Sequence, residues 1–144
     1  MIEIKKITAE ETYPIRLEVL RQNIPLPYEF NGDFDENTFH LGAFKDGKLV
    51  AVSSYMKERN ANFKGTQYQL RGMATLIEYQ GLGLGKLMLQ EAFSILKELK
   101  TNCLWCNARI KAVNFYEKLG LQTYGEKFEI KYVGDHYVMF KYVE

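Results

Sequence analysis

Apolar and polar side chains alternate in several short segments of the chain, which is the period expected of β-strands with one buried face. Residues 1–7 (MIEIKKI) show this alternation first. Residues 38–44 and 48–55 show it again on either side of Asp46-Gly47. Asp-Gly between two apolar runs predicts a tight hairpin, because the primed turn needs positive φ. Further strands are expected over residues 67–76 and 102–108, and two last strands are expected around Gly134-Asp135.

The first helix is expected directly after the first strand. Thr8-Ala9-Glu10-Glu11 has the form of a capping box, in which the hydroxyl and the glutamate each satisfy a free backbone amide. The helix then runs to about Gln22 with apolar residues at helical spacing. Pro14 suits a first turn better than a helix interior, so it favours a start nearer Thr12.

Two more helices follow later in the chain. Residues 83–100 have one continuous apolar face, and residues 110–119 form a shorter helix that ends before Gly120. The elements then occur in the order β-α-β-β-β-α-β-α-β-β. This order predicts an α/β (α+β) fold in one domain over residues 1–144, with a mixed sheet and helices on its faces.

Composition excludes several classes of protein. The 144 residues are 47% apolar and 26% charged, as in an ordinary globular protein. A net charge of +1 argues against a nucleic-acid partner that depends on a large basic surface. No apolar run is long enough to cross a bilayer, so no membrane partner is expected. Residues 1–7 lack the apolar core of a signal peptide, and a cytoplasmic location is the default.

The two cysteines do not predict a metal or redox site. Cys103 and Cys106 have the spacing of such motifs, but they lie in an expected strand, where residues three apart point to opposite faces. No second cysteine pair exists, and both histidines lie far away in the sequence. We therefore expect no metal.

A glycine-rich segment, Gln80-Gly81-Leu82-Gly83-Leu84-Gly85-Lys86, joins a strand to the long amphipathic helix. Glycine allows close approach of the backbone, and a helix N-terminus offers free amides and partial positive charge to a phosphate. The spacing fits neither the dinucleotide pattern G-x-G-x-x-G nor the P-loop, since Leu87 follows the lysine where a hydroxyl is needed. The segment therefore predicts a phosphate cradle of another kind, with a ligand-free turn as the alternative.

Residues 80–85 match the signature Q/R-x-x-G-x-G/A of the GNAT superfamily of N-acetyltransferases, which this chain resembles. The similarity extends to the preceding strand, residues 70–75, and to the later segments Asn107-Ala108-Arg109, Ala112 and Phe115-Tyr116-Glu117-Lys118-Leu119-Gly120. The order of elements also matches. The resemblance implies a mixed, mostly antiparallel central sheet of six to seven strands, flanked by about four helices.

The resemblance also implies acetyl-coenzyme A as a cosubstrate. In that family the glycine loop binds the pyrophosphate, and the strand before the loop pairs with the pantetheine arm. The amide of Met73 would then face the thioester oxygen, and Asn107 would bind pantetheine amides unless it only caps the next helix. The candidate cofactor-binding residues are Met73, Ala74, Thr75, Gln80, Gly81, Leu82, Gly83, Leu84, Gly85, Lys86, Asn107 and Phe115.

Tyr116 and His136 are the candidate catalytic residues. Tyr116 matches the family's tyrosine that donates to the leaving sulfur, although it could simply pack in the core. Many family members carry a glutamate base on the strand before the loop, but residues 67–75 contain no Asp or Glu. His136, His40 or a chain of water molecules are the alternatives, because histidine titrates near neutrality.

The expected acceptor is a primary amine of a small molecule or peptide. Its pocket is expected to form from residues 23–37 and the final hairpin, since loops vary on a fixed scaffold. Arg71, Arg109 and Arg16 can bind a carboxylate, or they can be surface arginines. A homodimer through the late strands is possible. The other classes kept open are a non-catalytic acyl-coenzyme A-binding regulatory module and a nucleotide-binding protein.

Overall fold

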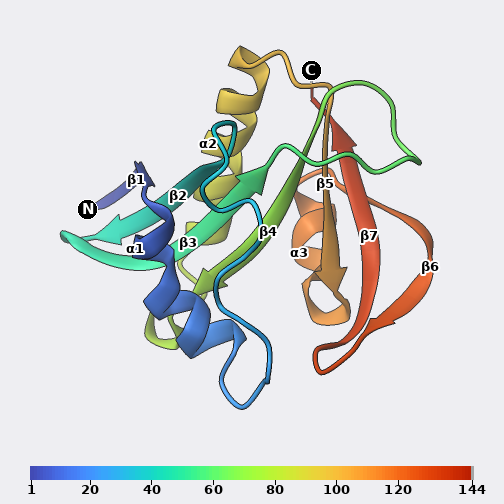
Figure 1. The fold of residues 1–144 in the computed structure, drawn as a ribbon. Coiled ribbons are helices and arrows are strands. Elements are labelled where there is room, and N and C mark those ends of the chain that lie inside the picture. The colour runs from blue at the N-terminus through green and yellow to red at the C-terminus, as the bar shows by residue number, and fades with distance from the viewer. Residues whose placement is uncertain (144) are drawn as a thin grey trace.

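The computed structural model describes residues 1–143, which form one seven-stranded sheet in the order β1-β2-β3-β4-β5-β7-β6 (Figure 1). The parallel pair is β4–β5, and the other neighbouring pairs are antiparallel. The mixed, mostly antiparallel sheet of six to seven strands is therefore confirmed. The strands are β1 (Ile2–Ile7), β2 (Phe39–Lys45), β3 (Lys48–Met56), β4 (Gln67–Thr75), β5 (Cys103–Arg109), β6 (Gln122–Ile130) and β7 (Gly134–Tyr142).

Helices cover both faces of the sheet. Helix α1 (Ala9–Ile15) lies in front of it in Figure 1, whereas α2 (Leu84–Glu98) and α3 (Val113–Lys118) lie behind it. About four helices were expected, and residues 1–143 hold these three α-helices with short helical turns between them. The turns are the π-helical η1 (Arg16–Leu20) and the 3-10 turns η2 (Ile77–Tyr79) and η3 (Ile110–Ala112).

The capping box fixes the start of α1. The Thr8 side chain accepts from the Glu11 amide, and the Glu11 carboxylate accepts from the Thr8 amide at 2.9 Å. The predicted start nearer Thr12 is therefore wrong, and Pro14 lies inside the helix. Because Pro14 has no amide proton, one bond of the helical ladder is missing, and the wider turn η1 follows directly.

Both hairpin turns are tight, but only one was located correctly. Asp46 and Gly47 have φ values of 49° and 85°, which confirms the Asp-Gly turn between β2 and β3. The last turn is made by residues 131–133, because Ile130 pairs with Gly134 and Glu129 pairs with Asp135. Gly134-Asp135 therefore begins β7 instead of forming the turn.

The core lies on both sides of the sheet. On one side, α2 buries Leu84, Met88, Leu89, Ala92 and Leu96. The two cysteines belong to different buried clusters, Cys106 with the α2 side and Cys103 with Phe63 and Trp105. Burial raises the pKa of the Cys103 thiol to about 11 and that of Cys106 to about 12. Both thiols therefore keep their protons at neutral pH. No helix in residues 1–143 is long and apolar enough to span a membrane.

The sheet opens between β4 and β5. The parallel ladder pairs Gln67 through Leu70 with Cys103 through Cys106 and then ends. Figure 1 shows the two strands side by side at one end and separating toward their carboxyl ends. On its other edge, β4 carries a bulge, since Ala74 pairs with Val52 but Arg71 pairs with Ser54. A bulge increases local twist, and this bulge lies where the strands part.

Candidate active site

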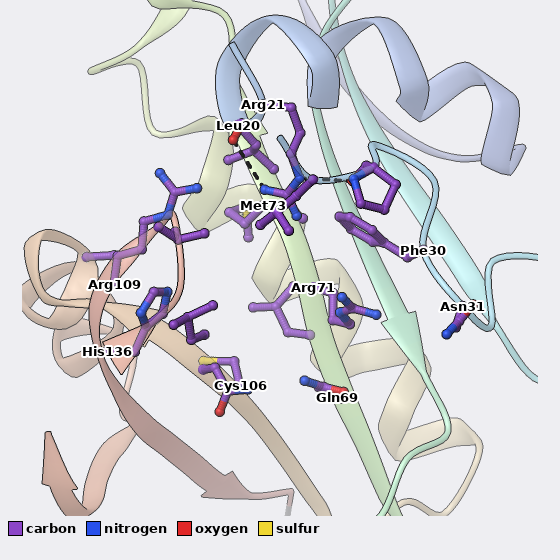
Figure 2. Close-up of a pocket in the computed structure, with 18 of the residues that line it drawn as sticks. Leu20, Arg21, Phe30, Asn31, Gln69, Arg71, Met73, Cys106, Arg109 and His136 are labelled. Atoms are coloured by element: carbon purple, nitrogen blue, oxygen red, sulfur yellow. Dashed lines mark hydrogen bonds between the residues drawn. The ribbon is translucent and has the colours of Figure 1, made fainter. Parts of the chain in front are cut away.

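A cavity of about 430 Å³ fills the opening between β4 and β5 (Figure 2). Its walls are β4 from Gln69 to Met73, the end of β5, residues 20–31 of the segment after α1, and the β6–β7 hairpin. In open sheets, ligands bind outside the carboxyl ends of parallel strands, which is where this cavity lies. The expectation that residues 23–37 and the final hairpin build the pocket agrees with this lining.

Gly72 explains how the bulge meets the pocket wall. Its φ is +65°, and a Cβ there would lie 2.9 Å from Phe30 Cε2 and 3.3 Å from Arg16 Nε. Only glycine therefore lets the ring of Phe30 pack against this strand. The bulge and the ring together set the distance between β4 and the segment that covers the cavity.

The edge of β4 that faces β5 has no strand partner from Arg71 onward. Met73 lines the cavity on this edge, whereas Ala74 and Thr75 continue the strand beyond it. The opposite edge stays bound to β3 through Ala74↔Val52 and Thr75↔Ala51. Backbone groups on the free edge are therefore available to an extended ligand.

The glycine loop lies between β4 and α2. Gly83 caps α2 with φ +80°, and a Cβ built on Gly81 or Gly83 meets nothing within 4 Å. Within the described chain no acceptor is recorded for the amides of residues 81–86. Gln80 steadies the loop by donating from Nε2 to the Thr75 carbonyl at 3.0 Å. The arrangement leaves free amides at the start of a fifteen-residue helix, which suits an anion.

Gly85 connects this loop to the cavity. A Cβ on Gly85 would lie 2.9 Å from Phe115 Cζ and 3.7 Å from Met73 Sδ. The Phe115 and Tyr116 rings are 5.0 Å apart and nearly perpendicular. The glycine loop therefore packs on Phe115, and Phe115 packs on Tyr116. Leu82 is exposed, Leu84 is buried, and Lys86 faces a second depression beside Lys118 and Lys141.

Tyr116 lies both in the core and in the cavity wall. Its side chain is 6% exposed and belongs to the main buried cluster. Among residues 1–143 no hydrogen bond is recorded for its hydroxyl. Burial, followed by the neighbouring Cys106 and Tyr55, raises the pKa of the phenol well above its ordinary value. The group therefore remains protonated over the working pH range and can donate into the cavity.

His136 lies across the cavity from β4, on β7. The ring is 3% exposed, and Nδ1 lies 2.7 Å from the Gly134 carbonyl. A carbonyl can only accept, so Nδ1 carries the hydrogen and Nε2 of the neutral ring has the free lone pair. His136 and Tyr116 line the same cavity.

His40 is outside the cavity and is bound on both ring nitrogens. Nε2 contacts the Asp33 carbonyl at 3.0 Å, and Nδ1 contacts Ser54 Oγ at 2.7 Å. Burial lowers the pKa of His40, and the charge of Arg16 acts in the same direction. His40 is therefore a neutral structural residue, not a free base.

Arg16 and Asp33 form a buried ion pair. Two hydrogen bonds of 2.9 Å join them, with side chains 0% and 1% exposed. Burial alone would raise the pKa of Asp33, but the bonds from Arg16 and from the Phe30 amide hold it below its ordinary value. Neither residue lines the cavity, and Arg16 is fully buried, so both alternatives given for Arg16, carboxylate binding and a surface position, are wrong. The pair anchors the covering segment to the sheet.

Three other arginines do line the cavity: Arg21, Arg71 and Arg109. Arg21 and Phe30 were not singled out from the sequence, since each lies in an irregular segment with no motif around it. Asn107 lines the cavity, whereas Asn114 and Glu78 are exposed outside it. Among the described residues no group of three or more His, Cys, Asp or Glu side chains could hold a metal ion.

Comparison with known proteins agrees with this arrangement. The family model described as "Acetyltransferase (GNAT) family" matches residues 3–121. The Bacillus subtilis (strain 168) protein described as "Uncharacterized N-acetyltransferase YitI" is 37% identical over 143 residues, which cover 98% of this chain and 96% of that protein.

Two solved structures are similar in fold alone. Escherichia coli ElaA has a TM-score of 0.80 at 17% identity, over 98% of this chain and 99% of that chain. An acyl-CoA N-acyltransferase from Pseudomonas aeruginosa has a TM-score of 0.78 at 19% identity, over the same shares of the two chains.

Proposed function

Because this chain belongs to the acetyltransferase (GNAT) family, we propose that it transfers an acetyl group from acetyl-coenzyme A to a primary amine of a small molecule or peptide. The observation that carries the proposal is the cavity at the end of the β4–β5 ladder, which Met73, Tyr116 and His136 line together. An unpaired strand edge, a buried phenol and an imidazole thus surround one space.

The chain offers coenzyme A two consecutive binding surfaces. The free amides of residues 81–86, with Gln80 and Lys86 beside them, would hold the pyrophosphate. The free edge of Met73, Ala74 and Thr75 would pair with the pantetheine arm as an added strand. Asn107 and Phe115 would border the arm on the far side. A Cβ at Gly81 or Gly83 would have no protein atom within 4 Å, so the space in front of the loop is open to a phosphate.

The transfer needs a donor to the oxyanion and a proton for the sulfur. The amine nitrogen attacks the thioester carbon, and the carbon–sulfur bond breaks as the intermediate collapses. The Met73 amide would donate to the oxygen that gains negative charge. Tyr116 would donate first a hydrogen bond and then its proton to the departing sulfur. Burial raises the proton affinity of a departing thiolate as it does that of the phenolate.

His136 would take the proton that the attacking amine releases. Nδ1 is fixed by the Gly134 carbonyl, so Nε2 is the acceptor in the neutral ring. The contact also holds the ring in one orientation, because a rotation would break a 2.7 Å hydrogen bond. His40 cannot share this role, since both of its ring nitrogens are bound.

Replacing Gly83 by Gln should abolish binding of acetyl-coenzyme A. The new side chain would need a φ near +80° and would project into the open cradle. Thermal unfolding with and without acetyl-coenzyme A measures this. A ligand that binds only the native protein adds about 2.7 kcal/mol of stability at a hundred times Kd. The wild type should show the shift, and Gly83→Gln should not.

Gly125→Gln is the matched control for the backbone cost. Gly125 lies in β6 with φ +75°, and a Cβ there also meets nothing within 4 Å. Both variants should lose similar stability without ligand, but Gly125→Gln should keep the shift. A full shift in Gly83→Gln, or an equal loss in both variants, would remove the loop from the binding site.

Replacing His136 by Gln should lower kcat/KM by about a hundredfold or more, because the amide side chain cannot take the proton that the attacking amine releases. The measurement is thiol release with one amine at neutral pH, in wild type and His136→Gln. His40→Gln serves as the control, since its ring lies outside the cavity, and it should keep kcat/KM. An unchanged kcat/KM in His136→Gln would leave water as the proton acceptor.

A further inference from the structure

Three arginines line the cavity from three different parts of the chain, and Figure 2 shows Arg71 on the side of Phe30 and Arg109 on the opposite side near His136. Arg21 follows the turn η1, Arg71 lies on β4 beside the bulge, and Arg109 ends β5. None of the three forms a salt bridge within residues 1–143. The buried Arg16, by contrast, is paired with Asp33 through hydrogen bonds from Nη1 and Nη2. The positive charges of the cavity arginines therefore have no salt-bridge partner among the described residues.

Their hydrogen-bonding groups are mostly free. Arg21 donates from Nε to the Pro27 carbonyl at 2.9 Å and from Nη1 to the Leu20 carbonyl at 3.2 Å. For Arg71 the recorded contact is with the Phe30 ring, whose centroid lies 4.3 Å from Cζ. Stacking uses the flat face of a guanidinium and leaves its N–H fork available. No hydrogen bond to another described residue is recorded for the side chains of Arg71 and Arg109.

The charge around the cavity is strongly one-sided. Glu29 is the one acidic residue in the described lining, and its side chain is exposed. Burial lowers the pKa of Arg21, and the charges of Arg109, Arg71 and Arg16 lower it further. Burial and then Arg16 lower the pKa of Arg71, whereas the charges of Asp33 and Glu58 act in the opposite direction. Arg21 is therefore the cavity arginine whose surroundings are wholly positive.

The position of these arginines separates them from the phosphate cradle. No residue between Leu76 and Lys86 lines the cavity, so its cations are not placed for the pyrophosphate. They surround the space beside Met73 and His136, where the acceptor would meet the thioester. Neighbouring apolar walls from Leu26, Ile130 and Val133 leave the guanidinium forks as the main polar features.

A carboxylate is the group that fits such forks. Guanidinium and carboxylate match in a planar, two-bond geometry, and the pair is stronger when partly buried. The same positive charge disfavours an ammonium ion nearby, so it lowers the pKa of a bound amine and favours the neutral nucleophile. A purely cationic amine gains neither benefit. A volume of about 430 Å³, shared with the end of the thioester arm, suits a small acceptor.

We propose that the acceptor is a small primary amine that also carries a carboxylate, such as an α-amino acid, and that the arginines of the cavity bind this carboxylate. The inference rests on the proposed acetyl transfer and adds the class of acceptor. Phe30 is then a positioning residue, since it holds the Arg71 guanidinium by stacking. Its ring in turn lies 3.9 Å from Arg16 Cζ, and its amide donates to Asp33 Oδ2 at 2.9 Å.

The test compares matched acceptors. Thiol release from acetyl-coenzyme A is measured with L-amino acids and β-alanine, each beside its primary amide, and with O-phosphoethanolamine and spermidine. The best acid should exceed its own amide in kcat/KM by about 10- to 100-fold, as expected for a charge-assisted bond. Acceptors without a carboxylate that are equal to or better than every acid would overturn the proposal, as would a preference for O-phosphoethanolamine.

Variants locate the effect. Arg71→Gln and Arg109→Gln should bring the acid-to-amide ratio toward one, and Arg71→Lys should give an intermediate ratio because it keeps charge but loses the fork. Arg59→Gln removes the same charge at an exposed position outside the cavity and should leave the ratio unchanged. An undiminished ratio in both glutamine variants, with folding confirmed by thermal melts, would contradict the assignment.

Failure of the proposed transfer would be recognised separately. If no amine releases thiol, calorimetry measures binding of the same acids and amides to wild type, with and without coenzyme A. Tighter binding of an acid than of its amide, lost in Arg71→Gln, would keep the carboxylate site without the enzymatic activity. Equal binding of acids and amides would overturn the site as well.

Discussion

Replacing Tyr116 by Phe should lower kcat by about a hundredfold or more while the affinity for acetyl-coenzyme A stays nearly the same. The phenol is buried in the cavity wall, and its raised pKa keeps it protonated and able to donate. Without the hydroxyl, the departing sulfur would leave as an unsolvated thiolate. Single-turnover kinetics, with binding measured by thermal shift, separates the two effects.

Tyr55→Phe provides the matched control. Tyr55 is also fully buried and belongs to the same core cluster, but its hydroxyl is bonded to Ser53 Oγ at 2.9 Å, and it does not line the cavity. Tyr55→Phe should lose about 1 kcal/mol of stability and keep turnover. Tyr116→Phe should show the reverse, since no bond to another described residue is recorded for its hydroxyl. Full turnover in Tyr116→Phe would remove it from the chemistry and favour a non-catalytic acyl-coenzyme A-binding module.

Asp33→Asn should destabilise the protein by about 3–5 kcal/mol, the cost of leaving a buried charge without its partner. Arg16 is fully buried and donates two hydrogen bonds to this carboxylate. Chemical denaturation at neutral pH measures the loss. Asp35→Asn, at an exposed position of the same loop, makes the identical chemical change and should have little effect.

The pH dependence of this pair has a defined sign. Because the pKa of Asp33 is lowered in the folded protein, its contribution is complete above the ordinary carboxyl pKa of 3.8 and is lost as the pH falls through the lower folded value. Asp33→Asn should therefore lose its disadvantage relative to wild type in strong acid. A wild type no more stable than Asp33→Asn at neutral pH would show that the ion pair contributes nothing to folding.

Local signals in the sequence predicted most of the scaffold. Asp46-Gly47, the glycine loop and the residues Phe115 to Gly120 each combine a special residue with a periodic neighbour, and each lies where it was expected. The sheet and its order also agree with the family resemblance. These features depend on interactions between residues close in sequence, and such local interactions can be predicted from one sequence.

The residues that complete the cavity depend on distant contacts. Arg16 is buried because Asp33 and Ser54 reach it from the far side of a long loop. Pro14 remains inside α1 because the capping box outweighs one missing bond. Arg21, Arg71 and Arg109 line one cavity although they are far apart in sequence, and that cavity lies where the β4–β5 ladder ends. No local pattern carries that information.

The strand order also leaves β1 and β6 at the two edges of the sheet. Exposed edges invite pairing with other chains, and both edges here discourage it. β1 is short and carries the exposed Lys5 and Lys6, while β6 is irregular between Tyr124 and Phe128 and exposes Glu126 and Lys127 there. A strand from a second molecule would have to follow that irregularity and cover those charges. The two outer edges of the sheet are therefore protected against pairing with other chains, whereas the unpaired edge of β4 lies inside the sheet, where a second chain would not reach it.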